Sequence, residues 1–277
     1  MAKTKTIPAF ALAIALLAID SAHGEDISPS SPDYMLMGMA SITSDYMMRG
    51  ISQTWGRPAL QAGGDLMLKN GFTAGFMAST ISPNYFPGAE TELDVYASFG
   101  ADFADEASWR VGAYAYLYPG GNLDKARPPL PSRSFNTLEA NAAVTWKWLT
   151  LKYSYALTDY MGIDTQQGYD GGSKGTQYIQ LDAAIPLRDH WSLSLHAAHL
   201  DIPASLMMPM MDGRTDPSYS DYGATLKWQF RPNWSASVGA SFASNAAIYG
   251  HMMSLRDASD MKDIGGARSF VMLQANF

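Results

Sequence analysis

The end of the chain alternates between two faces of a predicted β-strand. One face carries Ser269, Val271, Leu273, Ala275 and Phe277, and the other carries Phe270, Met272, Gln274 and Asn276. A strand with one face in lipid and the other toward a polar interior shows this period of two. Termini of soluble domains usually fray, so a strand that finishes on an aromatic residue favours a transmembrane β-barrel. We expect the barrel-insertion machinery of the outer membrane to read Phe277 as an assembly signal.

The beginning of the chain predicts a cleavable signal peptide over residues 1–24. Lys3 and Lys5 precede an apolar run over 7–19, and small residues stand at Ala22 and Gly24, where a signal peptidase reads. A membrane anchor is the alternative, but the run is short for spanning a bilayer and Asp20 follows it at once. We therefore expect export, a short lead over 25–33 and a single barrel over 34–277.

The composition narrows the class of protein. Hydrophobic residues make up 47% of the chain and charged residues 16%, yet the mean hydropathy is only −0.12. A barrel interleaves a polar face with its lipid face, which lowers the average in this way. The chain has no cysteine, which excludes disulfides and thiolate chemistry. The net charge of −7, without a basic cluster, argues against a nucleic-acid partner.

Strand-like segments with period-two alternation recur along the chain, and turn residues separate them. In 233–243, for example, Trp234, Val238 and Phe242 share one face with two alanines. We expect about twelve strands, each long enough to cross a bilayer core at a tilt of about 45°. They lie near 34–50, 59–69, 71–81, 90–102, 108–118, 135–146, 148–157, 176–187, 190–200, 219–230, 233–243 and 268–277. A soluble β-sandwich has the same period, so alternation alone does not separate the two folds.

The lengths of the connections do separate them, because short and long connections alternate. The short ones are a two-residue type I′ turn at Asn70-Gly71 and turns near 102–107, 147, 188–189 and 231–233. The long ones cover 51–58, 82–89, 119–134, 158–175, 201–218 and 244–267. Tight periplasmic turns with long external loops are typical of outer-membrane barrels. The sequence therefore predicts an all-β fold, an antiparallel up-and-down transmembrane barrel of about twelve strands.

Tryptophans support this orientation, because tryptophan favours the membrane–water interface. Six of the seven lie beside the short turns and predict a periplasmic girdle: Trp109, Trp146, Trp148, Trp191, Trp228 and Trp234.

The first hairpin carries a family pattern. It contains Ser44-Asp45-Tyr46, then Arg49-Gly50 and Ser52-Gln53, followed by Pro58, Gln61 and Asp65. This opening resembles that of the TorF family of porins. Further segments are similar to that family at 71–75, 92–96, 116–120, 151–155 and 191–196. The resemblance implies an outer-membrane porin without a defined substrate, while the methionine-rich loops 201–218 and 244–267 depart from the family.

Charged side chains should point into the barrel, because a basic residue on the lipid face costs about 2–4 kcal/mol at mid-membrane. By strand parity the inward set is Asp45, Arg49, Asp65, Lys69, Glu92, Asp94, Arg110, Glu139, Lys147, Lys152, Asp182, Asp221 and Lys227. We expect a water-filled constriction that these charges form with four inward tyrosines: Tyr96, Tyr114, Tyr116 and Tyr118. The function would be passive diffusion of small hydrophilic solutes, with a weak cation preference. An ion-pair network that closes the interior of a structural or adhesive barrel is the alternative.

Catalysis and metal binding have less support. An outer-membrane lipase or protease is the competing enzyme class, and Ser194, His196 and His199 would be its residues, but no G-x-S-x-G or H-E-x-x-H motif occurs. We expect no enzyme and no cofactor, with His196 as a hydrogen-bonding residue of the lumen and His190 in a turn. Thioethers beside an imidazole suit the soft ion Cu(I). Flexible apolar packing of the loops, which methionine does well, is the preferred explanation. The copper candidates are Met207, Met208, Met210, Met211 and His251.

Overall fold

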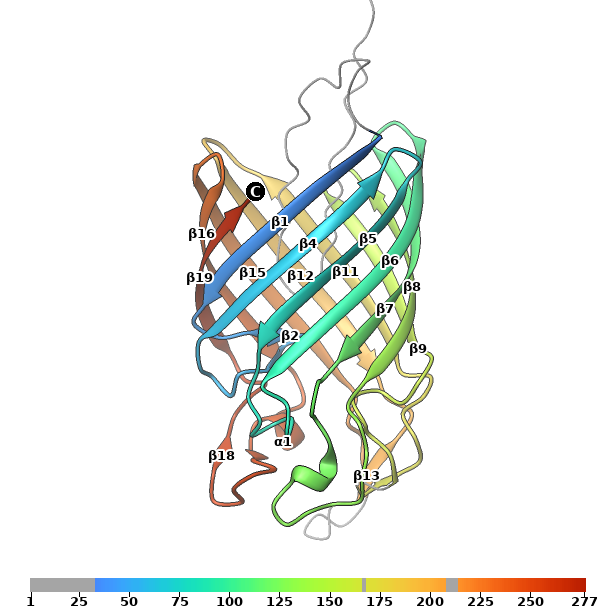
Figure 1. Ribbon diagram of the computed structural model, residues 1–277, viewed down its shortest axis with the longest axis vertical. Coiled ribbons are helices and arrows are strands. Elements are labelled where there is room, and N and C mark those ends of the chain that lie inside the picture. Colours follow the sequence, from blue (N-terminus) through green and yellow to red (C-terminus); the bar gives the residue numbers. More distant parts are fainter. Residues whose placement is uncertain (1–32, 166–167, 208–213) are drawn as a thin grey trace, which may run out of the picture.

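The computed structural model describes residues 33–165, 168–207 and 214–277, and its main feature is a closed barrel of twelve antiparallel strands (Figure 1). Strands that follow one another along the chain pair as neighbours, and the last strand closes the barrel on the first. The barrel strands are β1 (Tyr34–Thr43), β4 (Ala59–Leu68), β5 (Phe72–Thr80), β6 (Thr91–Ala104), β7 (Ala107–Leu117), β8 (Thr137–Trp146), β9 (Leu149–Ala156), β11 (Gln177–Pro186), β12 (Trp191–Asp201), β15 (Tyr219–Arg231), β16 (Trp234–Ala243) and β19 (Arg268–Asn276). The predicted fold class is confirmed.

The predicted strand 34–50 extends too far at its C-terminal end. β1 stops at Thr43, and the chain then forms a small hairpin of β2 (Met47–Met48) and β3 (Ile51–Ser52). Its two turn residues, Arg49 and Gly50, have φ of 48° and 77°, the left-handed pair that a type I′ turn requires. Two consecutive positive φ angles end an extended strand, so Asp45 and Arg49 belong to a loop and not to the first strand.

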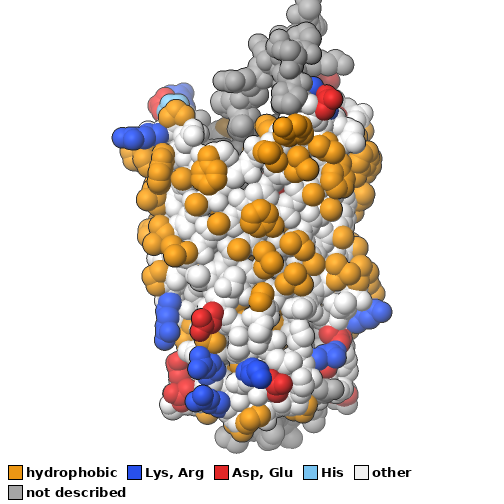
Figure 2. All heavy atoms as spheres, in the orientation of Figure 1, with side chains coloured by type: hydrophobic (Ala, Val, Ile, Leu, Met, Phe, Trp, Pro, Cys, Tyr) orange, Lys and Arg blue, Asp and Glu red, His pale blue; other side chains and the backbone are white. Residues whose placement is uncertain are grey.

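The outer surface of the barrel carries an apolar belt. In β19 the side chains of Val271 and Leu273 are exposed, whereas those of Phe270 and Met272 are buried, as the terminal alternation predicts. Figure 2 shows apolar side chains spread over the barrel wall, with charged side chains gathered toward its ends. Exposed apolar residues on one face of every strand suit contact with lipid.

The short turns all lie at the end of the barrel where the chain reaches Phe277, and the long loops lie at the other end (Figure 1). The predicted tryptophans flank these turns, and Trp191 stacks on Trp228 with ring centroids 5.7 Å apart. The two-residue type I′ turn at Asn70-Gly71 is wrong. The loop comprises 69–71, because Gly71 N–H donates to the Leu68 carbonyl and only Gly71 (φ 93°) is left-handed. That is the three-residue hairpin form, a turn followed by a glycine bulge.

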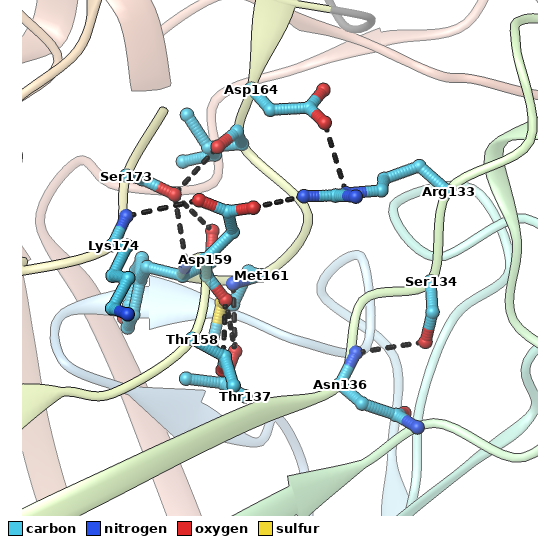
Figure 3. Close-up of polar contacts among 12 residues, drawn as sticks. Arg133, Ser134, Asn136, Thr137, Thr158, Asp159, Met161, Asp164, Ser173 and Lys174 are labelled. Carbon is cyan, nitrogen blue, oxygen red and sulfur yellow. Dashed lines mark hydrogen bonds and ion pairs between the residues drawn. The ribbon is translucent and has the colours of Figure 1, made fainter. Parts of the chain in front are cut away.

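The long loops contain short elements of their own and bind to one another. These elements are the 3₁₀ helix η1 (Leu123–Lys125), the helix α1 (Ala246–Tyr249), and the strands β10 (Tyr169–Asp170), β13 (Ser205–Met207), β14 (Arg214–Thr215), β17 (Met252–Met253) and β18 (Met261–Lys262). Arg133 pairs with Asp159 and, at 2.9 Å, with Asp164, and so ties loop 118–136 to loop 157–176 (Figure 3). Within the described ranges, no helix has the length and apolarity to span a membrane.

Candidate constriction inside the barrel

The β2–β3 hairpin crosses the interior of the barrel. It leaves the wall between β1 and β4, yet its tip residue Arg49 bonds to Glu139 on β8, which lies on the opposite side of the strand order. Arg49 Nη1 donates to Glu139 Oε1 at 2.9 Å, and Nη2 donates to Oε2 at 2.7 Å. The two side chains are only 7% and 2% exposed. This two-point pair is the strong geometry for arginine and carboxylate, and it fixes the hairpin against the far wall.

Aromatic rings enclose the guanidinium of Arg49. Its Cζ lies 4.2 Å from the ring centre of Tyr178, 5.4 Å from that of Tyr160 and 5.7 Å from that of Tyr116. A cation above an aromatic face is stabilised by the ring quadrupole. Tyr160 belongs to external loop 157–176, and burial raises its pKa to about 12, so its hydroxyl remains protonated at neutral pH. The tip also needs Gly50, because a Cβ there would lie 2.7 Å from the Cβ of Asp221.

Two carboxylates of β6 stand beside the hairpin. Glu92 and Asp94 are 0% and 1% exposed, and the hydroxyl of Tyr46 donates to Glu92 Oε1 at 2.8 Å. The predicted same-face placement of these two acids is correct. Tyr46 lies on the segment that leads into the hairpin, so the hairpin is bonded to β6 as well as to β8.

His196 on β12 organises a second polar group. Its Nδ1 lies 2.5 Å from Asp182 Oδ1 and its Nε2 lies 2.9 Å from Asp221 Oδ1. The hydroxyl of Tyr178 lies 3.0 Å from Nε2 and donates to Asp221 Oδ2 at 3.0 Å. Because Tyr178 also faces Arg49, this group is continuous with the Arg49–Glu139 pair.

Two further predicted inward acids, Asp65 and Asp45, accept hydrogen bonds outside these two groups. The hydroxyl of Tyr96 donates to Asp65 at 2.6 Å. Asp45 accepts hydrogen bonds from Ser52, Thr54 and Arg268, at 2.6, 2.7 and 2.8 Å. These bonds brace the base of the hairpin against β19.

The basic residues divide between the lumen and the turns. Arg110 points inward and donates to Ser98 at 2.9 Å and to Thr73 at 3.2 Å. Lys152 and Lys227 also follow the inward parity of their strands. Lys69 and Lys147 do not line the lumen. Both occupy short turns, where Lys69 pairs with Asp33 at 3.2 Å and Lys147 with Glu106 at 3.5 Å.

The predicted inward set lacks one charged residue of the barrel strands. Arg268 begins β19 on the same parity as the buried Phe270 and Met272, and it bonds to Asp45. The alternation of the terminal strand therefore contained the signal, and extending it by one more position would have found this residue.

The structure brings only some of the enzyme and metal candidates together. Ser194 lies two residues from His196 on the same inward parity of β12. His196 faces the lumen acids, whereas His199 lies on the outward parity of β12 and bonds to Ser220 at 3.0 Å. His251 is exposed between α1 and β17. Met208, Met210 and Met211 lie outside the described residues, as does the side chain of Met207. Among the residues that are described, no three histidine or acidic side chains gather as a metal cluster.

A cavity of about 560 Å³ opens among the external loops. Its charged lining consists of Glu90, Lys125, Arg127 and Arg256. The backbone N–H of Arg127 donates to the Leu255 carbonyl at 2.8 Å, which joins two of these loops at the cavity. With three basic side chains and one acidic one, the lining carries a net positive charge.

Comparison with known proteins gives a family and a set of related folds. Among solved structures, the KdgM porin is 10% identical over 88% of this chain and 99% of its own, with a TM-score of 0.48. The NanC porin is 9% identical over 87% of this chain and 98% of its own, with a TM-score of 0.49. OprD from Pseudomonas aeruginosa is 12% identical over 80% and 59%, with a TM-score of 0.41. No curated protein matches the chain. The model of the bacterial family Gcw_chp, whose function is unknown, matches residues 26–277, and the chain belongs to that family.

Proposed function

We propose that this protein is an outer-membrane channel through which small hydrophilic solutes diffuse passively. The observation that carries the proposal is the hairpin that enters the barrel and sets Arg49 against Glu139 among other charged side chains. Rings of charged side chains at a narrow point select among ions and solutes. The residues proposed to set selectivity are Asp45, Arg49, Asp65, Glu92, Asp94, Arg110, Glu139, Asp182 and Asp221. The resemblance to the TorF family of porins supports the same function.

The interior favours cations. Lys69 and Lys147 lie in turns, so the acidic side chains of the lumen outnumber the basic ones by a wider margin than strand parity predicts. Arg268 adds one positive charge, but Asp45 accepts its hydrogen bond. We propose a weak preference for cations over anions, set mainly by the acids of β6. Export through the signal peptide 1–24 and recognition of Phe277 by the insertion machinery complete the proposal.

A closed structural or adhesive barrel is the second candidate. The burial of Arg49 and Glu139, together with the aromatic ring against Arg49, favours it, because buried side chains inside a barrel narrow the path for solutes. The long external loops would then carry recognition, as loops commonly do.

Planar-bilayer recordings of the refolded protein decide between the two candidates. A channel gives discrete conductance steps. In a salt gradient, its reversal potential should have the sign expected when cations pass more readily than anions. In the double variant Glu92→Gln/Asp94→Asn the reversal potential should move toward zero.

The matched control is Asp105→Asn/Glu106→Gln, which removes the same two charges from an exposed periplasmic turn and should leave the reversal potential unchanged. Absence of any conductance from folded wild-type protein overturns the channel and leaves the closed barrel as the function.

A further inference from the structure

Two carboxylates in the barrel wall have more oxygen atoms than partners. Glu92 and Asp94 lie two residues apart on the inward face of β6, about 7 Å along one strand. Tyr46 satisfies Oε1 of Glu92, but Oε2 of Glu92 and both carboxylate oxygens of Asp94 lack a hydrogen-bond partner among the described residues. Burying an ionised carboxylate without a partner is strongly unfavourable. Such a buried pair is accommodated in one of two ways, by protonation of the carboxylates or by a bound cation.

Two buried tyrosine hydroxyls lie beside these two carboxylates. Tyr114 and Tyr118 on the neighbouring segment are 4% and 2% exposed, and neither hydroxyl has a hydrogen-bond partner of ordinary geometry in the described chain. The Tyr118 hydroxyl nevertheless interacts with Glu92, and the Tyr114 hydroxyl interacts with Asp94. Unpartnered oxygens from four side chains thus converge between β6 and the end of β7.

Two basic side chains stand near this group. Lys152 Nζ lies 6.0 Å from the ring centre of Tyr114, and Arg49 is committed to another acid. Arg49 acts electrostatically on Asp94, but both of its terminal nitrogens bond to Glu139. Glu139 itself adds a further negative charge near Asp94. The Arg49–Glu139 pair is neutral as a unit, so it does not offset the negative charge that Glu92 and Asp94 carry when they are ionised.

We propose that Glu92, Asp94, Tyr114 and Tyr118 form a binding site for one hard divalent cation of the calcium type. All donors are oxygen, and Ca²⁺ accepts carboxylates, neutral oxygens and water in a flexible coordination shell. One divalent ion balances the two carboxylates. With only two charged donors the site should bind weakly, with Kd on the order of 10⁻⁴–10⁻³ M, so that the ion exchanges readily. The cation site itself does not depend on the proposed channel. Only the expectation that the constriction concentrates such ions rests on that function.

Terbium luminescence tests the site directly. Tb³⁺ replaces Ca²⁺ in oxygen sites, and nearby tyrosines transfer excitation to it. Refolded protein in detergent, stripped with chelator, should show saturable tyrosine-sensitised emission that excess Ca²⁺ abolishes. Glu92→Gln/Asp94→Asn should lose this emission, whereas Asp105→Asn/Glu106→Gln should retain it. Tyr118→Phe should weaken binding about tenfold or less, because the carboxylates remain.

Folding of each variant is checked by its heat-dependent gel migration, and Asp94→Asn alone replaces the double variant if that variant does not fold. Wild-type emission that does not saturate, or that the Glu92/Asp94 variants keep, overturns the site. The result is independent of transport. Binding without conductance would refute the channel and support the cation site. Conductance without binding would refute the cation site and support the channel.

Discussion

At the scale of single residues, the Arg49–Glu139 pair matters most, because it joins a loop to the wall across the barrel. Both ends are buried, so each charge depends on the other for the solvation that it has lost. The pair Lys69–Asp33 has similar chemistry but is 44% and 95% exposed, and water screens it. The two pairs therefore differ in environment and not in kind.

We predict that Glu139→Gln lowers the free energy of unfolding by about 3 kcal/mol, because it leaves the Arg49 charge buried without a counter-charge. Urea titration of the protein in lipid vesicles measures the change. Lys69→Ala is the control and should cost less than about 1 kcal/mol. Equal losses in the two variants would mean that the lumen is wet enough at Arg49 to screen the pair.

At the scale of elements, the β2–β3 hairpin and the closing strand β19 have separate tasks. The hairpin crosses the barrel interior from the wall between β1 and β4 to β8. β19 completes the wall. Phe277, the residue after β19, exchanges two backbone hydrogen bonds with Gly38, at 2.7 and 3.0 Å. Phe277 is 74% exposed, and its ring lies where a Cβ on Gly38 would stand.

We predict that replacing residues 47–52 with a Gly-Ser linker increases single-channel conductance severalfold, because the hairpin no longer crosses the lumen. Planar-bilayer recording measures the step size. As a control, Gly-Ser-Gly in place of the exposed turn 257–259 between β17 and β18 should leave the step size unchanged. A hairpin variant that folds and conducts like wild type would show that the ion path avoids the hairpin.

We predict that deleting Phe277 lowers the amount of folded barrel in the outer membrane severalfold, because the deletion removes the terminal ring and both bonds to Gly38. Phe277→Ala keeps the backbone and separates the role of the ring from that of the bonds. Phe103→Ala, which removes an exposed ring from β6, is the control. Quantitative blots of heat-modifiable protein report the outcome, and wild-type levels of the deletion would contradict an assembly role for this residue.

At the scale of the whole molecule, closure of twelve strands leaves the barrel sheet without a free edge, so each barrel strand has a partner on both sides. In lipid this closure is obligatory, because unpaired backbone groups find no water there. The external loops add a second layer of order through contacts such as Arg133 with Asp164.

We predict that the refolded protein shows a sheet-dominated far-UV circular dichroism spectrum and migrates faster on a gel before boiling than after it. The physical reason is that a closed hydrogen-bonded wall resists detergent until heat breaks it. A helical spectrum, or protein that stays soluble without detergent, would contradict the barrel.

The amino-acid sequence by itself determined the wall of the barrel. Alternation specifies which face of a strand meets lipid, and turn chemistry specifies where the strand reverses, and both are local properties. The predicted strands therefore match the observed ones closely, apart from 34–50, where the extended pattern runs on into the hairpin. Parity also placed Glu92, Asp94, Glu139 and Asp221 inside the barrel.

Only the tertiary structure decided what those residues meet. Arg49 and Glu139 are 90 positions apart, and no local pattern records that a loop folds back across the lumen. The partners of His196 and the unpartnered oxygens of Asp94 likewise depend on barrel closure, which brings distant strands to a common axis. The two-residue alternation and the turns depend on residues that are close in the sequence. The constriction depends on residues that are distant in the sequence and meet only in the closed barrel.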